Sequence, residues 1–332
     1  MLSVIVPVYR NAEFVPQLIA EFTDISATVA ERHRMPVEVV FVVDGSPDNS
    51  FDLLKAALPQ APFRSQLLLH ARNFGSFAAI RTGLRAAKGD YFAVMAADLQ
   101  EPPDLVITFL DRLVNDVSDI VVGVREGRDD PGMTRLSANL FWRFYRRFVL
   151  PEIPAGGVDV FGCNQRIRDE LLRLEEANTS LVGLVYWLGF RRSEVPYRRR
   201  ERAHGKSSWT LAKKINYLLD SVFAFTDLPI RILTVIGLLG FLVAGCLAIF
   251  VIAMRLAGQI EAAGYAATIV VITFFGALNT LGMGFIGSYA WRSYENTKRR
   301  PLALVRTARS FEGSFDSGVG HDADLVSTER RQ

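Results

Sequence analysis

Two long runs without a charged residue constrain this 332-residue chain more than any other feature. Residues 232–254 contain no Asp, Glu, Lys or Arg, and neither do residues 268–291. A bilayer core about 30 Å thick is crossed by roughly 20 helical residues. The alternative is a pair of buried core helices, but core helices of this length rarely lack every charge. The sequence therefore predicts two C-terminal transmembrane helices.

The flanks of these runs predict how the helices are oriented. Nine Lys and Arg residues lie in 191–214 and six lie in 292–309, whereas the loop at 255–267 carries only Arg255 and Glu261. Positive residues accumulate on the cytoplasmic side of a membrane. We therefore expect a multi-pass protein of the inner (plasma) membrane, with both termini in the cytoplasm and the short loop outside.

The interior of the two runs carries small residues and no ionisable ones. Small residues let helices approach closely in lipid, so packing within or between copies of the chain is expected. A homo-oligomer, with a tetramer as one form of it, is consistent with these spans. The absence of a charge in mid-span argues against an ion pathway. The glycines of the two runs are Gly237, Gly240, Gly245, Gly276, Gly282, Gly284 and Gly287.

Charge and cysteine content narrow the remaining classes. The formal net charge is only +3, so the chain lacks the broad basic field of a nucleic-acid binder and no nucleic-acid partner is expected. Of the two cysteines, Cys246 lies inside the first apolar run and Cys163 lies outside both. A disulfide between them is not expected, which favours a reduced catalytic part that faces the cytosol.

From residue 1 to about residue 190, short apolar runs alternate with helical patterns. This order predicts an α/β domain with a doubly wound, mostly parallel sheet. Strands are predicted at 2–9, 37–43, 66–70, 91–97 and 118–124, and helices at 12–33, 48–58, 76–88 and 103–116. Ligands of such sheets bind beyond the carboxyl ends of the strands. Polar clusters stand at those ends, namely Tyr9 to Glu13, Asp44 to Asp48, Asp98 to Gln100, and Arg125.

Two further helical segments contain both basic and apolar residues. Residues 133–150 combine arginines with aromatic residues, which is typical of a helix at the membrane interface, although a surface helix packed on the sheet shows the same pattern. The second segment is 213–231, which leads into the first span.

The sequence predicts the following division of the chain. A cytoplasmic α/β domain at 1–212 is followed by a juxtamembrane amphipathic segment at 213–231. Spans at 232–254 and 268–291 are joined by the loop 255–267, and a basic segment with a disordered tail from residue 310 completes the chain at 292–332.

The segment Asp98-Leu99-Gln100-Glu101-Pro102-Pro103-Asp104 carries the strongest chemical signal. In extended backbone, residues two apart point to the same side, so Asp98 and Gln100 would offer two oxygens to one hard cation. Mg²⁺ or Mn²⁺ is commonly held by one or two carboxylates together with substrate phosphates, and it would neutralise a leaving diphosphate. A turn that leads into a helix at Pro103 is the alternative.

Other motifs are weaker when each is taken alone. Asp44-Gly45-Ser46-Pro47-Asp48 suits either a tight turn or a nucleoside contact. Asp159, in an apolar stretch, suits a base or positioning group, and equally a cap or a structural hydrogen-bond acceptor. The segment Arg202-Ala203-His204-Gly205-Lys206-Ser207-Ser208-Trp209 can bind phosphate oxygens just before the membrane, or it can serve only as a positive flank.

Together these stretches resemble family 2 glycosyltransferases of the GT-A fold, and within them the polyprenyl-phosphate sugar transferases. The resemblance covers roughly residues 1–305. The stretches that carry it are VIVPVY at 4–9, VDGSPDNS at 43–50, ARNFG at 71–75, GDYF at 89–92, ADLQEPPD at 97–104, RAHGKSSW at 202–209 and YENTKRRP at 294–301.

The resemblance implies a role for each matching residue. Pro7, Tyr9 and Asp44 would contact the nucleoside of a nucleotide-sugar donor, with Asp98 beside its diphosphate. Asp98 and Gln100 would hold the metal. Asp159 matches the acid expected near the acceptor phosphate. Arg202 and Ser207 match phosphate-binding residues, and Arg125 would assist them.

The chain also departs from the family pattern at three places. The family's Asp-x-Asp-x-Gln begins here with Ala96, its Asp-Asp-Gly-Ser is Val43-Asp44-Gly45-Ser46, and its Asn-Glu-Glu is Arg10-Asn11-Ala12. A catalytically degenerate, membrane-anchored binder of nucleotide sugars or lipid phosphates is therefore the main alternative. A processive polysaccharide synthase would carry a Gln-x-x-Arg-Trp motif and more spans. A lipid-flipping subunit is a weak reading of two uncharged spans.

The resemblance thus implies transfer of a sugar from a nucleotide sugar to a polyprenyl phosphate with inversion, for modification of a cell-envelope glycan. UDP-glucose is the favoured donor. Galactose, an aminosugar derivative, and mannose on GDP stay open. Undecaprenyl phosphate is the favoured acceptor because the two-span form resembles bacterial members of the family.

Overall fold

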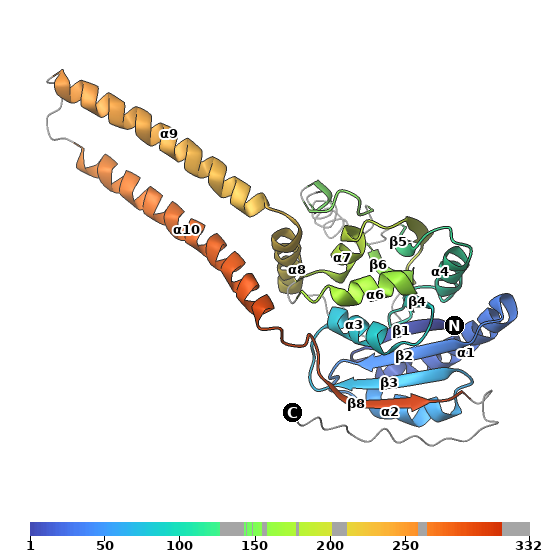
Figure 1. Cartoon of the computed structure of the whole chain (residues 1–332). Coiled ribbons are helices and arrows are strands. Elements are labelled where there is room, and N and C mark those ends of the chain that lie inside the picture. The colour runs from blue at the N-terminus through green and yellow to red at the C-terminus, as the bar shows by residue number, and fades with distance from the viewer. Residues whose placement is uncertain are drawn as a thin grey trace, which may run out of the picture.

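The computed structural model describes residues 1–126, 143, 145–147, 149–154, 158–176, 179–200, 211–257 and 264–313. One eight-stranded sheet of order β7-β5-β6-β4-β1-β2-β3-β8 forms the centre of the molecule (Figure 1). The strands are β1 (Leu2–Val8), β2 (Val37–Val43), β3 (Arg64–His70), β4 (Tyr91–Val94), β5 (Ile120–Arg125), β6 (Val158–Asn164), β7 (Arg192–Tyr197) and β8 (Val305–Phe311).

The central part of the sheet is parallel, as predicted. Strand β1 pairs in parallel with β2 and β4, β2 with β3, and β5 with β7. Antiparallel pairs join β6 to β4 and β5, and β8 to β3. The mixed α/β class with a mostly parallel sheet is therefore confirmed.

Helices cover both faces of this sheet. One face packs against η1 (Ala12–Phe14), α1 (Val15–His33), α2 (Ser50–Ala57) with η2 (Leu58–Gln60), and α4 (Asp104–Val114). The other face packs against α3 (Ser76–Ala86), α6 (Gln165–Arg173), α7 (Leu181–Trp187) and α8 (Leu211–Phe225). Every residue of β2 is buried, which explains its nearly continuous apolar sequence.

Three differences from the predicted elements bear on the site. The predicted strand 91–97 ends at Val94, because residues 97 and 98 form a turn and Leu99 has a φ of 52°. The sequence did not predict β6, α6, α7 or β7 as elements. It also placed residues 310 and 311 in a disordered tail, but they belong to β8, whose backbone hydrogen-bonds to β3.

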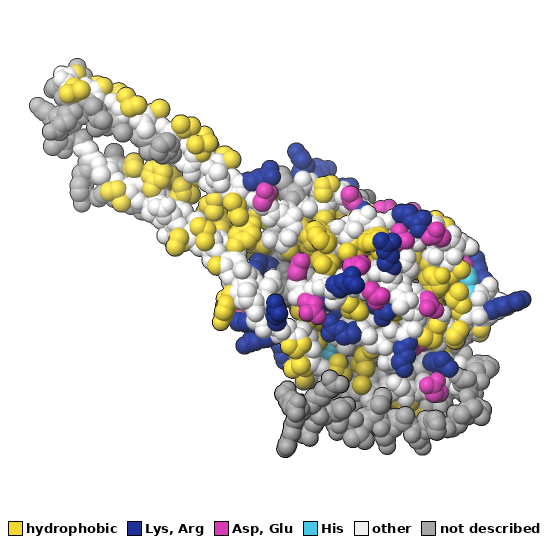
Figure 2. Space-filling model, viewed as in Figure 1, with side chains coloured by type: hydrophobic (Ala, Val, Ile, Leu, Met, Phe, Trp, Pro, Cys, Tyr) yellow, Lys and Arg dark blue, Asp and Glu magenta, His cyan; other side chains and the backbone are white. Residues whose placement is uncertain are grey.

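Beyond α8 the chain forms two long helices, α9 (Leu228–Leu256) and α10 (Tyr265–Thr297), which extend together away from the sheet (Figure 1). The predicted spans 232–254 and 268–291 lie within them. Many of their apolar side chains are exposed, including Ile249 at 70% and Met283 at 69%, and Figure 2 shows apolar side chains along this pair of helices, which we call the arm.

Within the described residues, no single helix is long and apolar enough to cross a bilayer, whereas Leu218–Phe225 and Leu228–Gly240 meet that requirement together as a pair bent by 76°. Transmembrane helices at 232–254 and 268–291 therefore remain a prediction. Cys163 is buried and Cys246 is exposed, and both are free thiols, as expected.

The arm is attached to the sheet domain by contacts at its root. Arg292 of α10 donates to Asp220 of α8 at 2.7 Å, and its guanidinium lies 5.1 Å from the ring centroid of Phe223. The ring of Tyr289 meets the same phenyl ring edge-on at 5.1 Å. Strand β8, which follows α10, then pairs with the edge of the sheet. The root of the arm is thus held by the contacts of α10 with α8 and by the pairing of β8 with β3.

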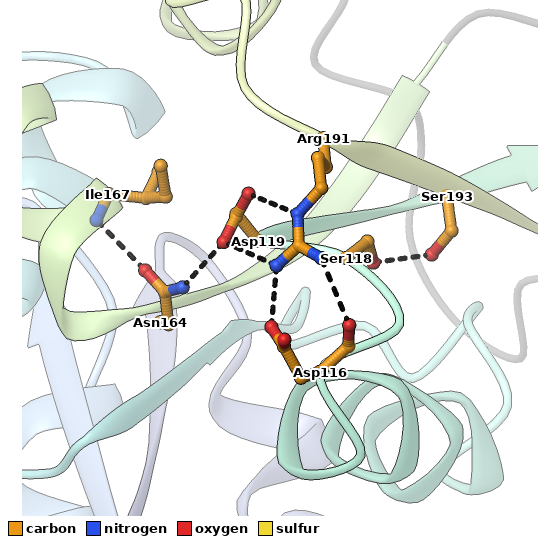
Figure 3. A network of polar contacts seen from close by, with 7 residues as sticks. All are labelled: Asp116, Ser118, Asp119, Asn164, Ile167, Arg191 and Ser193. Carbon is orange, nitrogen blue, oxygen red and sulfur yellow. Dashed lines mark hydrogen bonds and ion pairs between the residues drawn. The ribbon is translucent and has the colours of Figure 1, made fainter.

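A polar network at the amino-terminal end of β5 fixes the far edge of the sheet (Figure 3). Arg191 donates to both carboxylate oxygens of Asp119 at 3.1 and 3.2 Å, and also to Asp116. Asn164 donates to Asp119 and accepts from the backbone N–H of Ile167, which caps α6. Hydrogen bonds from Arg191 lower the pKa of Asp119 below its ordinary value of 3.8, although burial opposes this effect.

This network predicts a pH-dependent contribution to stability. A carboxyl group whose pKa is lowered on folding stabilises the protein above its unfolded pKa, and the effect is lost as the pH falls through the folded pKa. Asp119→Asn is therefore expected to destabilise the protein near neutrality. Denaturant unfolding should show the difference from the wild type shrinking as the pH falls below 3.8.

Glu170→Gln provides the control, because it removes an exposed i,i+3 ion pair with Arg173. Such pairs contribute little to stability. A stability difference for Asp119→Asn that stays constant from neutral pH into acid would contradict the assignment.

Candidate functional site

Polar residues from several strands meet at the carboxyl edge of the parallel sheet. The registers that pair Val8 with Val43, Val43 with Leu69, and Ile5 with Val94 bring the ends of β1 to β4 together. The sequence-predicted residues Pro7 and Tyr9 lie at the end of β1 and are half-buried. The predicted convergence of polar clusters at one edge therefore agrees with the sheet topology.

The loops after β1 and β2 are hydrogen-bonded to each other. Ser46 accepts from the backbone N–H of Arg10 at 2.7 Å, and Asp48 accepts from that of Ala12 at 3.1 Å. The Ser46 hydroxyl also donates to Asp48 at 2.7 Å. Burial raises the pKa of Asp48, but the hydrogen bonds from Ser46, Ser50 and Ala12 outweigh it, so the pKa lies below its ordinary value. Asp48 thus joins the two loops as an ionised hydrogen-bond acceptor.

Asp44, which the sequence associated with the nucleoside, is buried beneath a third loop. Only 2% of the residue is exposed. Its carboxylate accepts from the backbone N–H groups of Phe74 and Gly75 and contacts His70, each at 2.8 Å. The carboxylate therefore faces the protein interior and the loop 71–75, and sequence reasoning did not identify His70.

Asp98 and Gln100 lie in a turn, so the premise of extended backbone was wrong. Leu99 between them has a left-handed φ of 52°, and the backbone N–H of Gln100 lies 3.4 Å from the Asp98 carboxylate. Gln100 donates from Nε2 to the carbonyl of Arg200 at 3.3 Å, and Arg200 donates its N–H to the carbonyl of Gln100 at 2.8 Å. Because the amide nitrogen is engaged there, Oε1 is the atom of Gln100 that remains to accept or to bind a cation.

The donor atoms of this turn fit a hard divalent cation. A half-buried carboxylate and an amide oxygen are the ligand types that Mg²⁺ and Mn²⁺ prefer, with substrate phosphates completing the shell. Within the described residues, no three His, Cys, Asp or Glu side chains come together as a metal site. Ala96 precedes the turn and supplies no ligand.

The residues assigned to the acceptor lie at the same edge as far as the structure describes them. Arg125 ends β5, and its Nε is buried without a hydrogen-bond partner among the described residues. Strand β6 runs antiparallel to β5, and its register shifts where Val158 and Val160 oppose Val124 and Gly123. Asp159 is therefore the extra residue of a bulge beside the end of β5. The side chain of Asp159 is outside what the structure describes.

Arg202 and Ser207 lie outside the described residues. The chain leading to them is described up to Arg200, and that part is tied to the Asp98 turn. Arg200 is hydrogen-bonded to Gln100, and Arg199 lies 4.0 Å from Glu101, whose side chain is only 2% exposed. Sequence reasoning did not single out Arg199, Arg200 or Glu101, since contacts a hundred residues apart leave no local signal.

Comparisons with known proteins agree on a family. The profile described as "Glycosyl transferase family 2" matches residues 3–173. The undecaprenyl-phosphate 4-deoxy-4-formamido-L-arabinose transferase of Serratia proteamaculans is 30% identical over 92% of this chain and 93% of its own length. A putative glycosyltransferase of Bacillus subtilis, CsbB, is 30% identical over 93% of this chain and 92% of its own.

Solved structures give a more distant likeness. Mannosyl-3-phosphoglycerate synthase from Rubrobacter xylanophilus matches with a TM-score of 0.44 and 17% identity, over 66% of this chain and 72% of that one. Glucosyl-3-phosphoglycerate synthase from Mycobacterium tuberculosis, solved with Mn²⁺, UDP and glucosyl-3-phosphoglycerate, matches with a TM-score of 0.42 and 16% identity, over 68% of this chain and 77% of that one. A likeness of this degree assigns neither a substrate nor a metal.

The close approach of two loops at Gly45 predicts that this position tolerates no side chain. Its φ is +56°, and an added Cβ would lie 2.3 Å from the carbonyl carbon of Arg72. Gly45→Ala should therefore lower the free energy of unfolding by clearly more than the roughly 1 kcal/mol of left-handed strain, as measured by denaturant unfolding.

Gly189→Ala isolates the strain. Its φ is +69°, but the nearest atom to an added Cβ is 4.0 Å away. Equal losses in the two variants would show that the contact between the loops carries no cost.

Proposed function

Because the chain belongs to glycosyltransferase family 2 and is a glycosyltransferase, we propose that it moves a sugar from a nucleotide-sugar donor to a polyprenyl phosphate with inversion. UDP-glucose is the proposed donor and undecaprenyl phosphate the proposed acceptor. The product would be a lipid-phosphate-linked monosaccharide for modification of a cell-envelope glycan. The acceptor class is supported by a relative named as an undecaprenyl-phosphate transferase that is 30% identical over 92% of this chain.

One structural observation carries the proposal furthest. The Asp98 turn, the end of β5 at Arg125 and the bulge at Asp159 come to the same edge of the sheet, and Arg200, in the segment after β7, is hydrogen-bonded to that turn. This geometry supports a proposed diphosphate site beside a proposed acceptor-phosphate site. A transferase needs this arrangement, because its nucleophile and its leaving group flank one anomeric carbon.

The proposed chemistry is a direct displacement. A phosphate oxygen of the lipid attacks the anomeric carbon, the bond from that carbon to the diphosphate oxygen breaks, and its electron pair leaves with the nucleoside diphosphate. A phosphate monoester has a second pKa of about 6, so the nucleophile is largely ionised near neutrality. A strong general base is then less necessary than for a hydroxyl acceptor. We propose that Asp159 positions groups or balances charge.

The other residues bind and orient the substrates. Pro7 and Tyr9 would contact the nucleoside from the end of β1, and Arg125, Arg202 and Ser207 would bind phosphate oxygens. Arg125 is suited to this because its buried Nε has no hydrogen-bond partner among the described residues. Mg²⁺ or Mn²⁺, held by Asp98 and Gln100, would supply positive charge for the leaving diphosphate.

We further propose that the arm anchors the enzyme in the inner membrane, with spans at 232–254 and 268–291 and the catalytic domain in the cytoplasm. Two aromatic residues and a lysine cluster at the carboxyl end of α10. The Lys298 ammonium lies 5.0 Å from the ring centroid of Trp291 and 4.3 Å from that of Tyr294. Aromatic and basic residues are typical of a membrane interface. Gly240 faces Phe275 across the arm, whereas an added Cβ at Gly237, Gly245 or Gly276 would meet no described atom within 4 Å, which leaves room for another copy of the chain to pack.

The first test is transfer of labelled sugar from a panel of UDP- and GDP-sugars into an organic phase. The assay uses full-length protein, undecaprenyl phosphate, and Mg²⁺ or Mn²⁺ with a chelator control. A lipid product from one donor that depends on the metal would establish the reaction and identify the sugar. Nucleotide binding without product from any donor would instead support the catalytically degenerate binder suggested by Ala96.

The mechanism predicts an order among carboxylate variants. Asp98→Ala should reduce the transfer rate by about a hundredfold or more, because it removes the ligand beside the leaving group. Asp159→Asn should retain clearly more activity, because the nucleophile needs little proton removal. Initial rates of lipid-product formation measure both.

Asp104→Ala is the matched control, since this exposed aspartate lies in the same motif but begins α4. It should leave the rate near that of the wild type. Equal losses for Asp98→Ala and Asp159→Asn would contradict the proposed division of roles.

A further inference from the structure

Asp44 uses its hydrogen-bonding capacity inside the protein. Its Oδ1 accepts from the N–H of Phe74, its Oδ2 accepts from that of Gly75, and His70 Nδ1 lies 2.8 Å from Oδ1. The side chains of Asp44 and His70 are 3% and 0% exposed. A buried carboxylate is costly unless such donors satisfy it. Here three donors do so, and two of them belong to the backbone of one loop.

Both ring nitrogens of His70 have polar partners. Nδ1 lies 2.8 Å from Oδ1 of Asp44. On the other side of the ring, Nε2 lies 3.0 Å from the hydroxyl of Thr82 in α3, and that hydroxyl donates to the carbonyl of Ala78. Thr82 therefore fixes the ring from the helix side, and the ring in turn orients the carboxylate.

The loop fixed in this way places an exposed cation at the site edge. Phe74 meets the ring of His70 edge-on at 5.6 Å, and the guanidinium of Arg72 lies 4.1 Å from the centroid of Phe74. Arg72 is exposed and donates to the carbonyl of Asn73. The same loop lies directly against Gly45. A stack thus runs outward from the buried His70 through Phe74 to Arg72.

We infer that His70 and Asp44 form a buried positioning pair, and that the donor's nucleoside is recognised by the loop they hold, through Arg72, and not by the Asp44 carboxylate itself. A planar guanidinium that already rests on one aromatic ring offers its plane and its N–H groups to a nucleobase or to a ribose or phosphate oxygen. Asp44 then acts on the donor only through the position of residues 72–75.

This inference rests on the proposed nucleotide-sugar donor, so its test measures nucleotide binding separately from transfer. Calorimetric titration of the full-length chain with UDP and with GDP, in the presence of Mn²⁺, gives the dissociation constant. Arg72→Ala is expected to weaken binding of the preferred nucleotide by about tenfold or more. His70→Phe keeps a ring but removes the donor to Asp44, and it should weaken binding to a similar extent.

The double variant decides between a positioning role and a direct contact. If His70 and Asp44 act through Arg72, then His70→Phe adds nothing in the Arg72→Ala background. His70→Asn, whose amide can still donate to Asp44, should recover part of the loss. Thr82→Val removes the contact to Nε2 but keeps the His70 ring, so it should weaken binding less than His70→Phe does. In the transfer assay the KM for the donor should rise, while the KM for undecaprenyl phosphate stays unchanged.

The possible failures can be distinguished. If the wild type binds neither UDP nor GDP, the proposed donor class fails and this inference fails with it. If the wild type binds and Arg72→Ala binds equally well, only this inference is overturned. Additive losses in the double variant would also overturn it, because they mean that Asp44 or His70 reaches the nucleoside directly. Should His70→Phe fail to fold, the exposed Arg72→Ala and the conservative His70→Asn carry the same comparison.

Discussion

Burial of β1 and β2 on both faces decides where polar chemistry can occur in this molecule. A strand that is covered by helices on each side has room for polar side chains only at its ends. At the amino end of β2, the buried Glu38 accepts from Ser3, Gln66 and the N–H of Lys88 at 2.6 to 2.9 Å, which joins three strands to the end of α3. At the carboxyl end, Asp44 plays the corresponding part with His70 and the loop 71–75. Both carboxylates are satisfied by neighbours and not by solvent, so each one fixes the elements around it.

The two ends nevertheless serve different purposes. The amino end is closed by side-chain networks, among them the one centred on Arg191 and Asp119, and it holds the strands in register. The carboxyl end carries loops that hydrogen bonds hold in place. Asp48 accepts from Ala12, the buried Asp44 accepts from Phe74 and Gly75, and Gln100 accepts from the N–H of Arg200. The proposed transfer, which would bring a leaving diphosphate and an incoming phosphate to one carbon, would benefit from this arrangement, because the binding groups would be oriented before either substrate arrives.

The sequence predicted those parts of the structure whose signal is local. Strands β1, β2 and β3 were found because two-sided burial produces nearly continuous apolar runs. The end of β4 was missed because Met95 and Ala97 are apolar like the strand, while the turn depends on a left-handed Leu99 that no residue type announces. Strand β8 was missed because VRTARSF is polar and exposed, and the strand it pairs with among the described residues, β3, lies more than two hundred residues earlier. The motif at Asp44 was recognised, but no pattern reveals whether a carboxylate faces a ligand or the amides of a neighbouring loop.

The structure also bears on the missing acid at Ala96. A family member with one carboxylate fewer would seem a poor candidate for binding a divalent cation, but such ions are often held by one or two carboxylates plus substrate phosphates. Here the proposed ligand pair, Asp98 and Gln100, is held from outside the motif, since Gln100 exchanges backbone and side-chain hydrogen bonds with Arg200. The proposed phosphate acceptor would arrive already ionised, so the proposed reaction would need charge neutralisation and alignment from the protein more than proton removal. A single carboxylate in a fixed turn, next to the segment that follows β7, can meet that requirement. The residue Ala96 is therefore compatible with a working transferase.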